Sequence, residues 1–286
     1  MIYTISNGTL TAKIDSMGAE LISLASAAEE YIWQGEIWNS HAPVLFPACG
    51  RIVGNTYTYQ GKSYNMGKHG FAHTSDFAAE TVEDDRLVLA IETTPESYAS
   101  FPFEFKLEAE FALEGDTLRV SFTVYNKDGA AMPFMFGWHP AFNLLGDEPV
   151  ETYKLHFGET NCLTHHLLTD TKFVSGAIEA YPIEGGEYTI SEEEIYSQDT
   201  LIFSDTLGKV KLYNPACERS LEISWSDNLP YLALWKWPLS SARYICIEPW
   251  SGLPGDGVSA EVWENRLNVT LPAGEQESFV YTVKCK

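Results

Sequence analysis

The sequence predicts an all-β protein, a large antiparallel β-sandwich with few short helices. Long stretches alternate between apolar and polar residues, as strands with one buried face do. Gly, Pro and Asn interrupt these stretches at short intervals, and helical spacing is rare. With 286 residues, 45% of them hydrophobic, the chain is long enough to bury a large core. Since no linker, repeat or charge block divides it, we expect one domain over residues 1–286.

Two hairpins carry the clearest pattern. Every second residue is apolar over Phe103–Leu113, and after Glu114–Asp116 the alternation resumes over Leu118–Val124. Alternation on both sides of a short turn that contains glycine indicates an antiparallel hairpin. A second hairpin is predicted over Thr56–Met66, with its turn at Gly61-Lys62.

Further strands are expected where short apolar or alternating segments lie between turn residues. These segments are Thr9–Asp15, Arg86–Thr94, Thr200–Ser204, Lys209–Tyr213, Ser220–Trp225, Leu232–Trp237, Tyr244–Ile247, Leu267–Leu271 and Ser278–Lys284. Two segments favour short helices, Pro95–Ser100 and Glu192–Ser197.

The charge balance limits the partners of the chain. Its 18 basic and 40 acidic residues give a net charge of −22, which repels nucleic-acid phosphates and anionic membrane surfaces. The N-terminus lacks the features of a signal peptide, and no apolar run approaches the roughly 18 residues of a membrane helix. The five cysteines are scattered and odd in number, which suits free thiols in a reducing compartment. We therefore expect a cytoplasmic protein with no nucleic-acid or membrane partner.

Three stretches break the alternation and concentrate reactive side chains with Gly, Pro and Trp. They are His41–Asn55 together with Lys68–His73, then Phe136–Asn143, and finally Ile245–Gly257. Local patterns fail most often at functional positions, so these stretches are the candidates for a site.

Glu248 follows the apolar Ile245–Ile247 and precedes Pro249-Trp250, at the end of a predicted buried strand. A carboxylate in that setting loses hydration, which raises its pKa towards the range of a general base. The alternative is a structural glutamate paired with Arg243 or Arg51. The residues alone leave both open.

His139 lies between Trp138 and Pro140, with Phe136 and Phe142 close by. A lone histidine in apolar surroundings is more often a core residue whose ring nitrogens bond to the backbone than a proton donor. Its neighbourhood alone therefore favours a structural role.

No metal site is predicted from histidine spacing. His69 and His73 are four residues apart, a ligand spacing only on a helix, which Gly70 disfavours. We expect His69 near the surface of a turn. His165 and His166 should point to opposite faces of a strand. The sequence also lacks a G-x-S-x-G nucleophile motif and a phosphate-binding loop.

A histidine and a glutamate on an all-β scaffold rich in tryptophan fit carbohydrate chemistry, because indole rings offer flat apolar faces to sugar C–H groups. The tryptophans available for this are Trp33, Trp38, Trp138, Trp235, Trp237 and Trp250. Most tryptophans, however, belong to the core.

Together the three stretches resemble the aldose 1-epimerase (galactose mutarotase-like) family, most closely its LacX-like branch. The similar segments are Asn7–Leu24, Pro43–Asn55, Tyr57–His73, Phe136–Asn143, Gln198–Phe203, Leu232–Pro238 and Ile245–Gly252. The resemblance implies a β-supersandwich and an isomerase that interconverts the α and β anomers of an aldose without a cofactor. The implied partner is a small sugar, and the implied assembly a monomer or homodimer.

The resemblance also implies roles for five residues. Glu248 matches the catalytic base of the family and His139 its catalytic acid. His69 matches the second active-site histidine, Arg51 the substrate-binding arginine and Asp199 the sugar-binding aspartate. With these matches, the interpretation of His139 changes from core residue to proton donor.

The resemblance implies a free hexose as substrate, because His73 occupies a place where related sequences often have arginine. In the hexose-6-phosphate branch that arginine helps to bind phosphate. A hexose-6-phosphate epimerase is the nearest alternative, with Lys68, Lys236 and Arg243 as the basic candidates.

Three further alternatives remain from the sequence. The first is a sugar-binding protein without turnover, and the second is a β-sandwich interaction module. The third, a glycoside hydrolase, normally needs two carboxylates, for which Asp199 would have to join Glu248.

Overall fold

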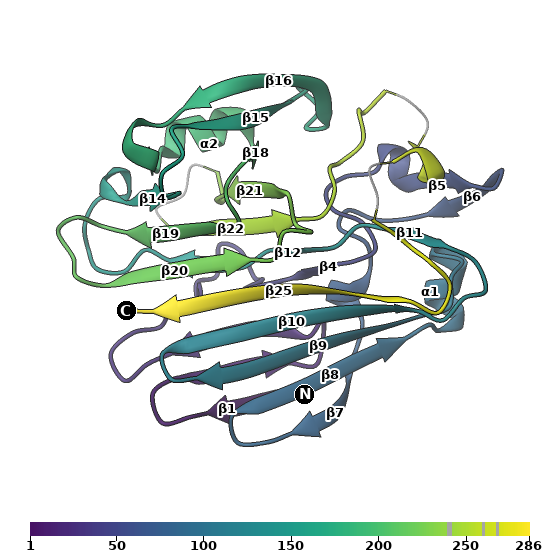
Figure 1. The fold of residues 1–286 in the computed structure, drawn as a ribbon, viewed down its shortest axis with the longest axis horizontal. Helices are drawn as coiled ribbons and strands as arrows, with labels where there is room; N and C mark the ends of the chain where they lie inside the picture. Colours follow the sequence, from purple (N-terminus) through teal and green to yellow (C-terminus); the bar gives the residue numbers. More distant parts are fainter. Residues whose placement is uncertain (239–241, 259–260, 267–268) are drawn as a thin grey trace.

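The structure is a computed structural model of residues 1–286 and describes all of them except 239–241, 259–260 and 267–268. Strands dominate it, and the described residues include two short α-helices, α1 (Pro95–Ser100) and α2 (Glu192–Gln198). The all-β prediction is therefore confirmed, as are the two helical segments. Figure 1 shows the long strands of the largest sheet side by side, with the second large sheet behind and above them.

The largest sheet has nine strands and is antiparallel. In spatial order they are β17 (Glu187–Thr189), β14 (Lys154–His156), β19 (Lys209–Tyr213), β20 (Ser220–Trp225), β25 (Gln276–Cys285), β10 (Thr117–Asn126), β9 (Phe105–Glu114), β8 (Arg86–Glu92) and β7 (Ala78–Val82). The first predicted hairpin forms β9 and β10, whose inward residues are buried in strict alternation along β9.

The second large sheet has eight strands and is also antiparallel. Its order is β16 (Val174–Pro182), β15 (Cys162–Leu168), β18 (Leu201–Ser204), β21 (Tyr231–Trp235), β22 (Tyr244–Trp250), β12 (Gly137–Trp138) and β4 (Val44–Leu45), with β13 (Ala141–Asn143) also paired to β22. All seven residues of β22 are buried, because strands flank it on both sides.

Smaller sheets complete the fold. They are the sheet of β1 (Ile2–Ser6), β2 (Thr11–Asp15) and β3 (Glu20–Ala25), the pair β11 (Met132–Phe134) and β24 (Val269–Leu271), and the sheet of β23 (Glu261–Val262), β5 (Thr56–Tyr59) and β6 (Lys62–Asn65). The second predicted hairpin forms β5 and β6, but its turn lies at Gln60-Gly61, one residue earlier than expected. Of the strand expected over Leu267–Leu271, residues 267–268 lie outside the described residues.

Aromatic side chains join the two large sheets. Phe136 stacks on Phe279 with ring centroids 4.6 Å apart, and Trp138 meets Tyr281 edge-on at 5.2 Å. Phe279 and Tyr281 belong to β25 of the nine-stranded sheet. Because successive residues of an extended chain point to opposite sides, anchoring Phe136 and Trp138 in this core turns His139 to the other face.

All five cysteines are free thiols, in agreement with the sequence prediction. Among the described residues, no helix has the length and apolar character needed to cross a membrane.

Candidate active site

The site is built on the outer face of β22 and of the segment that pairs with it. Ile245 and Ile247 belong to the main hydrophobic core, so the alternate residue Glu248 projects from the opposite face. Gly137 pairs with Trp250 and Ala141 pairs with Cys246. Both pairs belong to one antiparallel register, which places His139 opposite Glu248.

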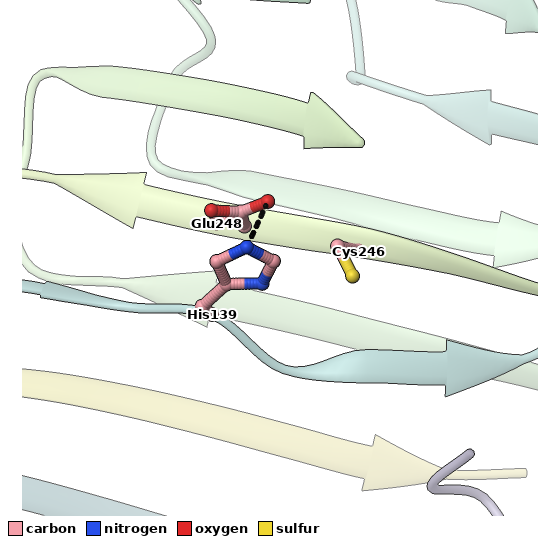
Figure 2. A group of neighbouring side chains, drawn as sticks. All are labelled: His139, Cys246 and Glu248. Atoms are coloured by element: carbon pink, nitrogen blue, oxygen red, sulfur yellow. Dashed lines mark ion pairs between the residues drawn. The ribbon is translucent and has the colours of Figure 1, made fainter. Parts of the chain in front are cut away.

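His139 and Glu248 contact each other inside the protein. Nε2 of His139 lies 3.2 Å from Oε1 of Glu248, and the two residues are only 7% and 1% exposed. Figure 2 shows the imidazole and the carboxylate facing each other from neighbouring strands. Neither Glu248 oxygen nor Nδ1 of His139 has a hydrogen-bond partner. A buried pair with unused bonding capacity is suited to exchanging protons with a ligand.

Burial controls the protonation of this pair. It lowers the pKa of His139 to about 3, with the nearby positive charge of Lys68 acting in the same direction. Burial also raises the pKa of Glu248 well above its usual range, against an opposing effect of Lys68. Both shifts favour the uncharged form of each side chain, and a separation of 3.2 Å is short enough for a proton to pass between them.

The described residues do not supply the structural partners that were considered for these two side chains. His139 is buried, but the backbone does not satisfy its Nδ1. Arg243, proposed above as a partner for Glu248, instead donates to the carbonyls of Gly146 and Glu148. The ion pair of Arg51 in the described part of the chain is with Asp199.

His69 is half-buried in a turn, with a positive φ of 66°. Its position in a turn was expected, but its ring reaches the site, with its centroid 5.7 Å from that of His139. The backbone N–H of Gly50 donates to Nδ1 of His69 at 3.1 Å. Because Nδ1 accepts, Nε2 carries the proton in the neutral ring and is free to donate. Burial keeps the ring neutral by holding the pKa of His69 well below its usual range.

A cavity reaches the His139–Glu248 pair, and charged side chains from separate loops line it. Asp199 caps the C-terminus of α2, and its Oδ2 lies 4.0 Å from Nη2 of Arg51. Lys68 and Lys172 line the same cavity. Lys172 follows β15 in a turn that was not predicted, so sequence reasoning missed it.

The cavity encloses only about 40 Å³ and opens directly to solvent. Trp235 and Trp250 form part of its wall, and Trp38 packs on His139 with ring centroids 5.1 Å apart. Trp138, by contrast, is fully buried in the core, and Trp237 is 40% exposed.

Of the three basic candidates for a phosphate, only Lys68 lines the cavity. Lys236 is buried and pairs with Glu192 at 2.8 Å, while Arg243 binds the carbonyls described above. His73 does not line the cavity either. The presence of histidine rather than arginine at position 73 is therefore weaker evidence about the substrate than the sequence comparison indicated.

The fold and the site define a class: a two-sheet β-sandwich protein with a buried histidine–glutamate pair at the inner end of a cavity. A family model for aldose 1-epimerase matches residues 1–284. The chain therefore belongs to the aldose 1-epimerase family, which confirms the resemblance seen in the sequence.

The chain is similar to other proteins over nearly its whole length. Protein LacX of Lactococcus lactis subsp. lactis is 28% identical over 283 residues, covering 94% of each chain. A galactose mutarotase-like protein from Lactobacillus casei ATCC 334 is 31% identical with a TM-score of 0.93, covering 100% of both chains. A galactose mutarotase related enzyme from Lactobacillus acidophilus is 28% identical with a TM-score of 0.92, covering 100% of this chain and 97% of that one.

Proposed function

We propose that the protein is a cofactor-independent aldose 1-epimerase that interconverts the α and β anomers of a hexose. The observation that carries the proposal is the His139–Glu248 contact, buried and short of hydrogen-bond partners at the inner end of a cavity. Mutarotation needs one group that takes a proton and another that gives one. When one proton lies on His139, His139 can give it and the ionised Glu248 can take another.

In the proposed reaction the proton of the Glu248 carboxyl group first passes to His139, which leaves Glu248 as the carboxylate. Glu248 takes the proton of the anomeric hydroxyl while His139 gives its proton to the ring oxygen. The bond between C1 and the ring oxygen breaks, and O1 becomes the oxygen of an aldehyde. After rotation about the C1–C2 bond, the ring oxygen attacks the other face of C1 and both protons return. The pair is thereby regenerated.

The other polar groups are assigned to orientation of the sugar. Nε2–H of His69 and the guanidinium of Arg51 would donate to sugar oxygens, and the carboxylate of Asp199 would accept from hydroxyls. Their positions around the cavity support these roles. The aromatic walls of Trp235 and Trp250 suit the apolar faces of a sugar ring.

Polarimetry with freshly dissolved α-D-glucose and α-D-galactose tests the proposal. We expect the wild type to accelerate mutarotation, and Glu248→Gln and His139→Asn each to lose about 10²- to 10⁴-fold of the rate, the usual contribution of general acid–base catalysis. His165→Asn is the matched control, because His165 is also buried but lies outside the cavity. Full acceleration in both site variants would refute the assignment. A wild type that binds sugars without accelerating mutarotation would identify a binding protein instead.

A second candidate substrate is an aldose with an anionic group, such as a hexose 6-phosphate. The observation that favours it is local charge: Arg51, Lys68 and Lys172 all line the cavity of a chain whose net charge is −22. Among the described residues of the cavity wall, the acidic ones are Asp199 and Glu248, and burial opposes the charge of Glu248. Such a concentration of cations attracts an anionic ligand.

Lys172→Gln separates the two substrates. If the anionic group binds here, kcat/KM for glucose 6-phosphate should fall about tenfold or more, because a charge-assisted hydrogen bond contributes about 1.5–3 kcal/mol. The value for glucose should change little. Lys62→Gln, on the exposed β5–β6 hairpin, is the control. Equal effects of Lys172→Gln on both sugars would leave the free hexose as the substrate.

A further inference from the structure

Three buried side chains with metal-ligating atoms converge beside the cavity, at the His139–Glu248 pair. His139, Cys246 and Glu248 each offer one ligand atom, and these atoms lie within 4.8 Å of one another. In Figure 2, Cys246 and Glu248 extend from one strand while His139 reaches them from the next. Among the described residues this is the group whose geometry admits a metal ion.

The strand register explains the cluster. Cys246 and Glu248 are two residues apart on β22, so they share a face. His139 lies opposite Glu248 and is therefore a diagonal neighbour of Cys246 on that face. Because the ligands come from two strands far apart in sequence, no spacing motif reveals them.

The ligand atoms are not committed to other partners. Nδ1 of His139 and both oxygens of Glu248 lack hydrogen bonds, and Cys246 is a free thiol. Cys246 is fully buried and does not line the cavity, so the proposed sugar reaction gives it no role. Buried polar atoms without partners are rare in folded proteins, and their presence on two side chains of one cluster points to a ligand.

We propose that His139, Cys246 and Glu248 bind a thiophilic divalent cation, with Zn²⁺ the best match, and that this ion inhibits the acid–base pair. Imidazole nitrogen, thiolate sulfur and carboxylate oxygen are the donors Zn²⁺ prefers. The thiolate and the carboxylate together neutralise its two charges, which permits binding in a buried place. A fourth coordination position would face the cavity and accept water or a sugar hydroxyl.

The geometry requires only a modest contraction. Bonds of about 2.0–2.3 Å in a tetrahedral site place ligand atoms about 3.3–3.8 Å apart. The upper limit of 4.8 Å in the structure is about 1 Å longer. Rotation of the three side chains can close that gap. On binding, Zn²⁺ replaces the protons of the thiol and the carboxyl group, which leave to solvent.

Inhibition follows because Zn²⁺ uses the same electron pairs as the proton. A histidine nitrogen and a glutamate oxygen that bind the metal are no longer available to give or take protons. This consequence rests on the proposed epimerase function, whereas metal binding itself does not. The two claims therefore have separate readouts.

Binding is tested with Co²⁺, a spectroscopic substitute for Zn²⁺, added to the full-length protein. We expect a near-ultraviolet sulfur-to-cobalt charge-transfer band in the wild type, which Zn²⁺ abolishes by competition. The band should be lost in Cys246→Ser and Cys246→Ala and kept in Cys162→Ser, whose cysteine is exposed. Thermal unfolding confirms that each variant is folded. Absence of the band in the wild type, or its persistence in both folded Cys246 variants, overturns the site.

Inhibition is tested by polarimetry in the presence of Zn²⁺. We expect Zn²⁺ to slow mutarotation by the wild type and by Cys162→Ser, and the Zn²⁺ concentration for half-inhibition to rise at least about tenfold in Cys246→Ala. Equal sensitivity of all three proteins overturns the inhibitory role. A cobalt band in a protein without epimerase activity would refute the proposed function and leave the metal site standing.

Discussion

At the scale of single residues, the central feature is a pair of ionisable side chains whose environments keep both uncharged. His139 would normally hold a charge below pH 6.5 and Glu248 above pH 4.5, yet burial opposes both charges. Oppositely shifted acid and base groups that share a site are typical of proton-transfer chemistry. The same shifts have consequences for stability.

The pH dependence of stability follows from the direction of each shift. The lowered pKa of His139 gives a contribution that is present above pH 6.5 and lost as pH falls towards 3. The raised pKa of Glu248 gives a contribution that is present below pH 4.5 and lost as pH rises. Above pH 4.5 the two effects therefore oppose each other, and the effect of Glu248 makes the protein less stable as pH rises through the raised pKa of this carboxyl group.

Glu248→Gln should remove the loss of stability that Glu248 causes as pH rises. We expect the free energy of unfolding of the wild type to fall relative to that of the variant as pH rises above 4.5, by up to about 1.4 kcal/mol per pH unit, since one pKa unit corresponds to that energy. Urea unfolding at pH 5, 6, 7 and 8 measures this fall. Glu218→Gln, at an exposed position, should behave like the wild type. Parallel curves for the wild type and Glu248→Gln would contradict the assigned protonation.

At the scale of elements, the site depends on how loops are seated against strands. Gly70 forms a parallel bridge with Phe46, beside the turn that carries His69. Its φ is +74°, and a Cβ added there would lie 2.7 Å from the backbone nitrogen of Pro47. The close approach of two backbones therefore fixes the His69 turn against the segment next to β4.

Gly70→Ala should destabilise the protein and weaken sugar binding. Gly61→Ala is the matched control, because Gly61 has the same φ of +74° but open space around it. We expect Gly61→Ala to cost about 1 kcal/mol from the left-handed backbone and Gly70→Ala about 3 kcal/mol, with overpacking added. Thermal and urea unfolding measure the difference, and KM for the sugar reports the position of His69. Similar losses in the two variants would show that the backbone approach is unimportant.

The sequence revealed about half of the described strands, because alternation is a local signal, and it also revealed both helices. It drew attention to Glu248 and His139 as polar residues in apolar stretches, but only the family resemblance assigned His139 a functional role. It did not reveal their contact, which depends on pairing between β22 and a segment distant in the chain. Lys172 and Cys246 were missed as site residues for the same reason: one lies in a turn between unpredicted strands, and the other looks like an ordinary core cysteine.

At the scale of the whole molecule, charge is unevenly distributed. The net charge of −22 keeps the surface acidic, while cations gather at one cavity. A net charge of this size opposes self-association and repels the phosphates of nucleic acids. The cations at the cavity mouth have a different effect, because they concentrate anionic ligands at one place.

The residues of the site differ in how they are held. Glu248 belongs to β22, and His139 joins β12 and β13, which both pair with β22, whereas Arg51, Lys68, Lys172 and Asp199 lie in loops. Loops accept substitutions and insertions more readily than paired strands do. Descendants of this chain can therefore change which molecule they recognise by altering the loops alone. The reacting groups would be inherited unchanged, so closely related proteins of this fold should differ in ligand preference before they differ in chemistry.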